Sequence, residues 1–312
     1  MSDKIATRVA YGTTLAEIGS NENIIVLDAD LSKSTRTDFF QKKYPERHFN
    51  MGIAEGNMMA VAAGLASCGK TVFASTFAIF ASGRAYDSVR NSIGYPHLNV
   101  KIGATHAGIT VGEDGASHQA LEDIALMRAI PGMTVISPAD AVSTSALVKQ
   151  AAEMYGPVYL RLGRLDVPVI YPTDTQFSIG KGVKLKDGKD ITIIATGFMV
   201  EPALRASEIL KSEGIDVRVI DIHTIKPIDT DIIIKAAEET GAILTCEEHN
   251  IMGGLGSAVS EVVVKNSPVP MDMLGVMDTF GKSGKPADLI NKFGLTAENI
   301  IEKAKALLNK KR

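Results

Sequence analysis

The sequence has few cysteines, no tryptophan and no long apolar run. Cys68 and Cys246 are the only two cysteines among 312 residues. Two thiols cannot build a disulfide scaffold or a four-thiolate metal site, and so few are typical of a reducing compartment. The start, MSDKIATRVA, lacks the apolar segment of a signal peptide, and no apolar run reaches the length of a membrane span. We therefore expect a cytoplasmic protein without a membrane partner.

The charges are nearly balanced, with 33 Lys and Arg against 36 Asp and Glu and a net charge of -3. This balance excludes a strongly basic stripe, so we expect no nucleic acid as the main partner. Hydrophobic residues make up 45% of the chain and charged residues 22%, which is ordinary for a globular protein. A chain of this length exceeds the usual size of one hydrophobic core, and we expect two domains.

Short apolar segments alternate with helical ones along the chain. This alternation predicts an α/β fold made of two parallel-sheet, doubly wound domains. We expect the first domain at 1–172, a linker at 173–190 with little periodicity, and the second domain at 191–312. The expected strands lie near 23–28, 71–77, 99–104, 134–137, 158–162, 191–195, 217–220 and 242–246. The helices expected include 8–18, 81–93, 139–154 and 296–310, the last capped by Thr296.

A glycine-rich loop at 105–119, THAGITVGEDGASHQ, carries the densest polar chemistry. It follows an expected strand and precedes a helix, where ligands usually bind in open α/β sheets. His106, Asp114 and His118 could offer hydrogen-bond donors and acceptors to a polyol. A solvated surface loop is the plain alternative. A metal site is a third reading, but the spacing fits no standard ligand set, so we predict no metal site here.

Glu55 lies at a strand-to-helix junction, just before an apolar helix. It could be a first-turn carboxylate that the helix dipole stabilises by about 0.3–1 kcal/mol. Alternatively, burial beside Met51, Ile53 and Met58 would favour its protonated form, which can donate to a ring nitrogen. The residue type alone leaves both interpretations open.

The remaining candidates are weaker when taken singly. Phe80 could stack on a flat ring, whereas its neighbour Phe77 is expected in the plain core. Arginines at 8, 161 and 164 could bind phosphate through two parallel hydrogen bonds, or form ordinary surface ion pairs. The glycines at 253–256 lack the spacing of a dinucleotide-binding loop and indicate a close-packed turn.

Taken together, these stretches resemble the carboxy-terminal half of a transketolase. NMGIAEGNM at 50–58 resembles the family segment with the catalytic glutamate, and 105–119 resembles its substrate loop. TFAIF at 76–80 is similar to the ring-stacking segment, and DADLSKS at 28–34 to the segment near the cofactor. The resemblance covers nearly the whole chain.

The resemblance implies thiamine diphosphate chemistry, in which a ketol unit passes from a ketose phosphate to an aldose phosphate through a cofactor ylid. It implies a pyrimidine-binding domain followed by a transketolase-type carboxy-terminal domain. Glu55 would bind the aminopyrimidine and, with His106 and His118, act in catalysis. The other implied roles are cofactor contacts by Asp30, Ile53 and Phe80, hydroxyl binding by His106, Asp114 and His118, and phosphate binding by Arg8, Ser34 and Arg164, with Arg161 the weaker match.

Two features depart from the family pattern. Gly83 stands where many relatives place another aromatic, and a Gly-Asp-Gly segment for the diphosphate and metal occurs nowhere in the chain. We therefore predict a split enzyme whose partner chain carries the diphosphate site and binds magnesium or calcium. We expect an α2β2 heterotetramer with an obligate interface on the order of 2,000 Å². The carboxy-terminal domain is expected to be structural, and Glu248 and His249 have no assigned role.

Three other functions stay open. The β subunit of a 2-oxoacid dehydrogenase also has a GIAE segment, but its substrates need no phosphate-binding arginines. The carboxy-terminal half of 1-deoxyxylulose-5-phosphate synthase resembles the loop, with an acidic residue where His106 stands here. A non-catalytic regulatory subunit would have no physical reason to keep Glu55 beside apolar side chains.

Overall fold

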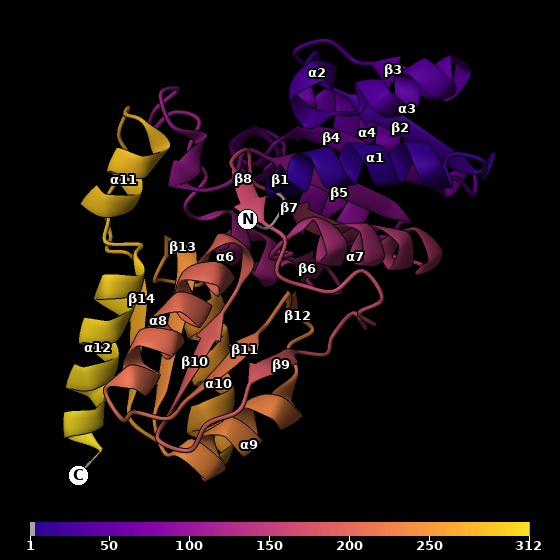
Figure 1. Cartoon of the computed structure of the whole chain (residues 1–312). Coiled ribbons are helices and arrows are strands. Elements are labelled where there is room, and N and C mark those ends of the chain that lie inside the picture. The colour runs from indigo at the N-terminus through magenta and orange to yellow at the C-terminus, as the bar shows by residue number, and fades with distance from the viewer. Residues whose placement is uncertain (1–3, 312) are drawn as a thin grey trace.

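The computed structural model describes residues 4–311, which form two α/β domains, each built on its own sheet (Figure 1). The first sheet has the spatial order β12-β6-β7-β5-β4-β2-β3. Its strands are β2 (Ile24–Asp28), β3 (His48–Asn50), β4 (Thr71–Phe77), β5 (Val100–Thr105), β6 (Thr134–Ile136), β7 (Val158–Arg161) and β12 (Thr224–Lys226). All neighbours in this sheet run parallel except β12, which pairs antiparallel with β6.

Helices cover the first sheet, and a small antiparallel ladder joins β1 (Lys4–Ala6) to β8 (Asp166–Pro168). The helices are α1 (Thr7–Ile18), α2 (Ser32–Thr35), α3 (Asp38–Lys43), α4 (Glu55–Ser67), α5 (Tyr86–Ser88), α6 (Asp123–Ala129) and α7 (Ala141–Glu153). Shorter 3₁₀ turns lie at Pro45–Arg47 and Ile109–Val111. The segment expected as one helix at 81–93 is instead broken, with π-helical turns at Phe80–Arg84 and Val89–Gly94.

The second sheet has the order β14-β13-β10-β11-β9. Its strands are β9 (Val183–Lys186), β10 (Ile191–Ala195), β11 (Val217–Asp221), β13 (Ile243–Asn250) and β14 (Met271–Val276). The helices are α8 (Val200–Ser212), α9 (Thr230–Thr240), α10 (Leu255–Asn266), α11 (Pro286–Lys292) and α12 (Ala297–Lys310), with a 3₁₀ turn at Gly197–Met199. The Thr296 hydroxyl accepts a hydrogen bond from the backbone N–H of Asn299, which confirms the expected cap of α12.

The sheets are parallel because their central strands are buried on both faces. All five residues of β2 and of β10 are buried, and such strands read as continuous apolar runs. The two-domain α/β prediction is confirmed, but each sheet also carries one antiparallel edge strand. One of them, β9, falls in the expected linker at 173–190. Its lysines, typical of an exposed edge, made the segment resemble a linker.

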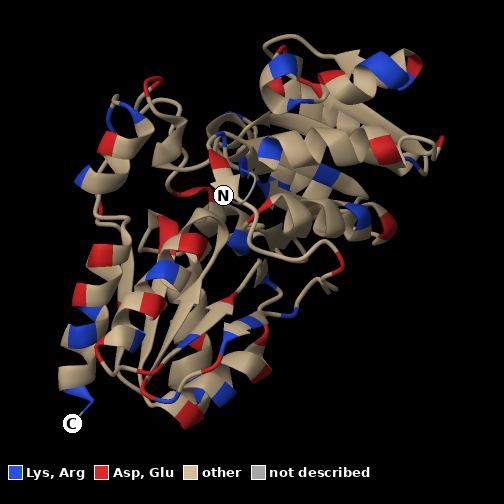
Figure 2. Ribbon diagram, viewed as in Figure 1, with Lys and Arg blue, Asp and Glu red and all other residues tan. Residues whose placement is uncertain are grey.

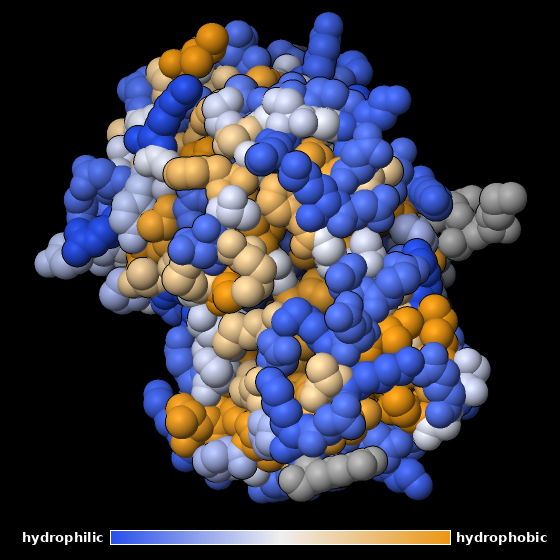
Figure 3. Space-filling model, turned by 90° about the vertical axis from the view of Figure 1, so that its left-hand side faces the viewer, coloured by the Kyte–Doolittle hydropathy of each residue, from blue (hydrophilic) through white to orange (hydrophobic). Residues whose placement is uncertain are grey.

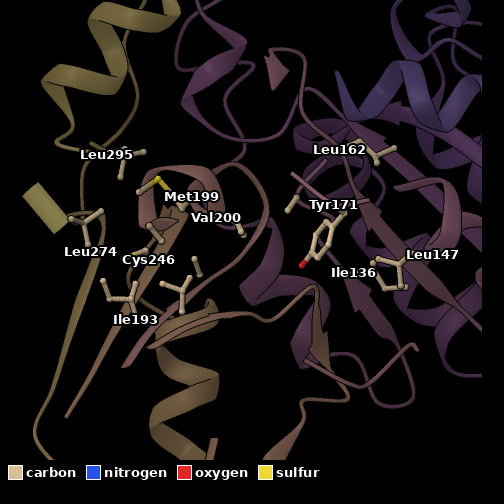
Figure 4. Packing of buried hydrophobic residues seen from close by; sticks show 14 of the residues in the cluster. Ile136, Leu147, Leu162, Tyr171, Ile193, Met199, Val200, Cys246, Leu274 and Leu295 are labelled. Carbon is tan, nitrogen blue, oxygen red and sulfur yellow. The ribbon is translucent and has the colours of Figure 1, made fainter. Parts of the chain in front are cut away.

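Two clusters of buried hydrophobic side chains each extend across both domains. β12 leaves the second half of the chain and pairs with β6 of the first sheet. One of these clusters runs from Leu147 and Leu162 in the first domain through Tyr171 to Ile193 and Cys246 in the second (Figure 4). The domains therefore pack directly against each other and are not connected by the linker alone.

Buried charges cross the same boundary. The Arg161 guanidinium donates from Nε to Asp123 Oδ2 at 2.9 Å and from Nη2 to the Glu248 carbonyl at 2.9 Å. The Arg161 and Asp123 side chains are 6% and 0% exposed. Most other charges lie outside, and Figure 2 shows both signs interspersed along helices such as α12. Within residues 4–311, no helix has the length and apolar character needed to cross a membrane.

Replacing Arg161 by methionine should lower the free energy of unfolding by about 3–5 kcal/mol, because Asp123 would stay buried without its cation. Denaturant unfolding measures this loss. Arg205→Met is the matched control, since Arg205 makes an exposed pair with Glu298 at 3.6 Å and should cost less than about 1 kcal/mol. Equal losses in the two variants would contradict a structural role for the buried pair.

Candidate active site

The candidate residues meet at one edge of the first sheet. Asp30 follows β2, Glu55 follows β3, Phe80 follows β4, His106 follows β5 and Arg164 follows β7. The carboxyl ends of parallel strands lie along the same edge, where ligands bind in open α/β sheets. The topology thus brings together segments that are far apart in the sequence.

Glu55 is the first residue of α4 and is only 4% exposed. Within residues 4–311, the Glu55 carboxyl pairs with the Arg84 guanidinium, whose Nη1 lies 3.5 Å from Oε1. This is a long contact, and the Arg84 side chain is 59% exposed. Arg84 also lies over the Phe80 ring, with its Cζ 4.4 Å from the ring centroid. A flat group with N–H donors therefore already sits between the buried carboxyl and the aromatic face.

Three stacked rings and a fourth ring that stands edge-on to them lie next to Arg84. The His106 ring lies 3.9 Å from Phe77 and nearly parallel to it, and Phe77 stacks on Phe80 at 5.8 Å. The His118 ring stands edge-on to Phe80 at 5.4 Å. Phe77 is buried, as expected of core, yet it is also the platform on which His106 rests.

His106 is held as a neutral imidazole. It is 3% exposed, has a positive φ of 57°, and its Nδ1 lies 3.0 Å from the Thr105 hydroxyl. Burial lowers its pKa to about 3, and the nearby positive charges of Arg8 and Arg164 act in the same direction. At neutral pH the ring can therefore both donate and accept a hydrogen bond, as binding to a sugar hydroxyl requires.

The carboxy-terminal domain holds the loop that carries His106. Glu248, at the end of β13, accepts a 2.7 Å hydrogen bond from the backbone N–H of Thr110. Gly108 has a φ of +81°, and a Cβ there would lie 2.2 Å from the Glu248 carboxyl carbon, so no side chain fits. Burial raises the pKa of Glu248 to about 7, although Arg161 and the Thr110 N–H oppose this shift.

The segment before α11 packs on the other end of the same loop. A Cβ on Gly115 would lie 2.3 Å from the Ser283 hydroxyl, and Gln119 donates to the Lys282 carbonyl at 2.9 Å. Figure 1 shows α11 next to the loop, away from the second sheet. Two of the loop glycines are thus explained by close approach of the other domain. Sequence analysis assigned Glu248 no role, because its hydrogen-bond partner Thr110 lies 138 residues earlier in the chain.

Arginines form the polar side of the site. Arg8 Nη1 donates to the Ser34 carbonyl at 2.8 Å, and its backbone N–H to the Gly163 carbonyl at 3.4 Å. These bonds hold Arg8 next to Ser34 and next to Gly163, which precedes Arg164. The phosphate-binding role of the three residues stays a prediction. Burial lowers the pKa of Arg8, and the charges of Arg36 and Arg164 lower it further. Arg161 is turned into the domain boundary instead, and Arg36 and Arg84 were not foreseen.

Other predicted residues are less enclosed. Ile53 is 77% exposed, so it does not bury Glu55 as expected. Asp114 is exposed in the turn between Gly112 and Gly115, and Asp30 is exposed while accepting a 2.9 Å bond from the Asn50 amide. A Cβ on Gly83 meets no atom within 4 Å, so the ring pocket is open there.

The residues fit the aminopyrimidine part of thiamine diphosphate. The buried Glu55 carboxyl has most of its hydrogen-bonding capacity unused, and the half-exposed Phe80 ring offers a face for stacking. The planar Arg84 guanidinium already makes both contacts. Within the described part of the chain, no group of three or more His, Cys, Asp or Glu side chains could hold a metal ion.

Comparison with known families assigns both domains. Residues 3–169 match the transketolase pyrimidine binding domain, and residues 180–300 match the transketolase C-terminal domain. The chain belongs to the transketolase family. The predicted family, fold class and enzyme class are therefore confirmed.

Individual relatives agree with this assignment. A chain described as a transketolase C-terminal section from Methanocaldococcus jannaschii is 52% identical over 95% of this chain and 94% of its own length. A 6-deoxy-6-sulfo-D-fructose transketolase subunit from Clostridium sp. is 42% identical over 97% of this chain and 95% of its own length. The transketolase of Rattus norvegicus is 41% identical over 99% of this chain but only 50% of its own length.

A solved structure is similar over its whole length. It is described as a split-gene transketolase in an inactive beta4 tetramer, and it superposes with a TM-score of 0.92 at 53% identity. The match covers 99% of this chain and 100% of that one.

The neutral state of His106 predicts a specific pH response. The unfolded chain binds a proton on this imidazole below about pH 6.5, whereas the folded chain does so only near pH 3. Stability should therefore fall as the pH drops below 6.5. NMR should show a His106 ring signal that does not shift between pH 8 and 5, assigned by its loss in His106→Gln. The same signal in denaturant should titrate near 6.5, and a midpoint near 6 in the native protein would contradict the buried neutral ring.

Proposed function

We propose that this chain is one half of a two-chain transketolase, which transfers a two-carbon ketol unit from a ketose phosphate to an aldose phosphate. The observation that carries the proposal is that the buried Glu55 carboxyl and the Phe80 ring both contact one planar group, the Arg84 guanidinium. This pair fits the aminopyrimidine of thiamine diphosphate, and the family match to a pyrimidine binding domain supports it.

The bound cofactor would supply the carbon nucleophile that adds to the ketose carbonyl. Glu55 would hold a proton at the pyrimidine ring nitrogen, which general acid–base catalysis requires. Phe80 would stack on the ring once Arg84 moves aside, and Asp30 and Ile53 would border it. His106, Asp114 and His118 would bind the sugar hydroxyls, with the two imidazoles also able to move protons. Arg8, Ser34 and Arg164 would hold the terminal phosphate.

A partner chain would complete the site with the diphosphate-binding segment and its magnesium or calcium ion. Large apolar side chains near the pocket support an interface, since Ile53 and Phe280 are 77% and 86% exposed. Phe280 and Ile79 line one groove of about 350 Å³, and Figure 3 shows apolar patches among polar residues on one face of the molecule. We propose an α2β2 heterotetramer. The exposed free thiol of Cys68 supports a cytoplasmic location.

Reconstitution tests the two-chain proposal. With an amino-terminal transketolase chain, thiamine diphosphate and magnesium, the protein should convert xylulose 5-phosphate and ribose 5-phosphate to sedoheptulose 7-phosphate and glyceraldehyde 3-phosphate. Glu55→Gln should lower kcat by about two to four orders of magnitude, because it removes the proton donor. Glu46→Gln is the matched control, since Glu46 is exposed in a surface turn and should retain activity.

Each arm of this assay has an outcome that contradicts part of the proposal. Full activity of Glu55→Gln would remove the carboxyl from the mechanism. Activity of this chain alone would contradict the need for a partner. Oxidation of a 2-oxoacid with lipoamide, in place of ketol transfer, would favour a dehydrogenase subunit.

A further inference from the structure

Arg36 packs beside Arg8 without belonging to the predicted phosphate set. Arg8 and Gly12 lie one turn apart on α1, so they share a face of that helix. A Cβ on Gly12 would lie 2.5 Å from the Cβ of Arg36, so Arg36 covers Gly12 directly. The bond from Arg8 to the Ser34 carbonyl ties the two segments together only two residues before Arg36.

The backbone at Arg36 is held in an unusual conformation. Its φ is +67°, in the left-handed region that is unfavourable for a residue with a side chain. The hydroxyls of Thr35 and Thr37, on either side, both donate to Asp28 Oδ2, at 2.7 and 3.0 Å. The buried carboxylate of Asp28 therefore fixes the turn. The position of Arg36 is set before any ligand binds.

The arginines of this cluster have few close carboxylate partners in the described part of the chain, although the charge of Asp166 acts on Arg8 from further away. Among residues 4–311, no ion pair within 4 Å includes Arg8 or Arg36, and Arg164 has only the exposed Glu113 at 3.5 Å. The Nε atoms of Arg8 and Arg36 are both buried without a hydrogen-bond partner in the same part of the chain. A buried donor without a partner is unfavourable, and more so when it carries a charge. An anion with several oxygens would balance the positive charge of these guanidiniums.

Arg36 also rests against an aromatic ring. Its Cζ lies 5.9 Å from the Phe39 ring centroid, an arrangement that leaves the N–H donors in the guanidinium plane free. Phosphate dianions suit such donors better than monoanionic groups do, because each added guanidinium gains more from a doubly charged ligand.

We propose that Arg36 is a specificity-determining residue, the third guanidinium of the site that binds the terminal group of the sugar. With Arg8 and Arg164 it selects a phosphate dianion over an uncharged or singly charged end. The inference rests on the proposed function and adds to it a third arginine, which distinguishes a phosphate from a sulfonate end. The similar sulfofructose transketolase subunit is named for a sugar with a sulfonate end. The comparison to test is therefore phosphate against sulfonate.

The reconstituted enzyme gives the first test. Arg36→Met should raise the KM for ribose 5-phosphate by at least about tenfold with little change in kcat, since one charged hydrogen bond is lost. The kcat/KM for unphosphorylated ribose should not change. Arg36→Lys should restore part of the affinity, and Arg36→Gly, which accepts the left-handed turn without strain, should behave like the methionine variant.

Lys33→Met is the matched control, because Lys33 is an exposed cation on α2, three residues from Arg36. It should leave the KM for ribose 5-phosphate within about twofold, as screened surface charges contribute little. An unchanged KM in Arg36→Met, or an equal loss with ribose and ribose 5-phosphate, would overturn the proposal.

Binding to the purified chain separates this inference from the transketolase assignment. ³¹P and ¹H NMR titrations at pH 8 can compare methyl phosphate, a dianion, with methanesulfonate, a monoanion. The native chain should bind methyl phosphate more tightly, and Arg36→Met should reduce that preference at least about fivefold. Equal binding of both probes by the native chain would refute the selectivity, whether or not the reconstituted enzyme transfers ketol groups.

Discussion

The site depends on one loop that is clamped between the two domains. The Glu248 carboxylate and the Thr110 N–H hold it at one end, and Gln119 with the segment before α11 holds it at the other. Glycine at 108 and 115 is required because the second domain approaches too closely for a Cβ. His106 therefore owes its position to residues that lie more than a hundred positions further along the chain. This gives the carboxy-terminal domain a direct part in building the site.

Uncompensated polarity is the second feature of the site. Glu55 is buried with one long contact, and the Nε atoms of Arg8 and Arg36 lack partners in the described chain. Each group is costly in the free protein and becomes favourable only with a bound ligand of opposite character. The carboxyl suits a ring that carries a proton, and the guanidiniums suit an anion. Under the proposed function, these groups would bind a flat ring and a charged sugar.

Much of this arrangement was predictable from the sequence, and the rest has identifiable causes. Parallel strands, Glu55 at the start of α4 and the clustering of Arg8, Ser34 and Arg164 all follow from local pattern or family resemblance. The edge strands β9 and β12 were missed because they are short and polar, so their pairing is decided by tertiary contacts. Arg36 and Glu248 carry no local signal at all. Ile53, in contrast, was expected to be buried because it is apolar. An exposed apolar side chain also fits a surface that a partner chain covers.

Hydrogen exchange of the backbone amides at 106–119 tests the clamp most directly. The native chain should protect the Thr110 amide, and Glu248→Ala should speed its exchange about tenfold or more, while amides in β4 and β5 keep their protection. Glu261→Ala, which removes an exposed partner of Arg128, should change nothing in the loop. Unchanged protection of Thr110 in Glu248→Ala would show that the first domain holds the loop by itself.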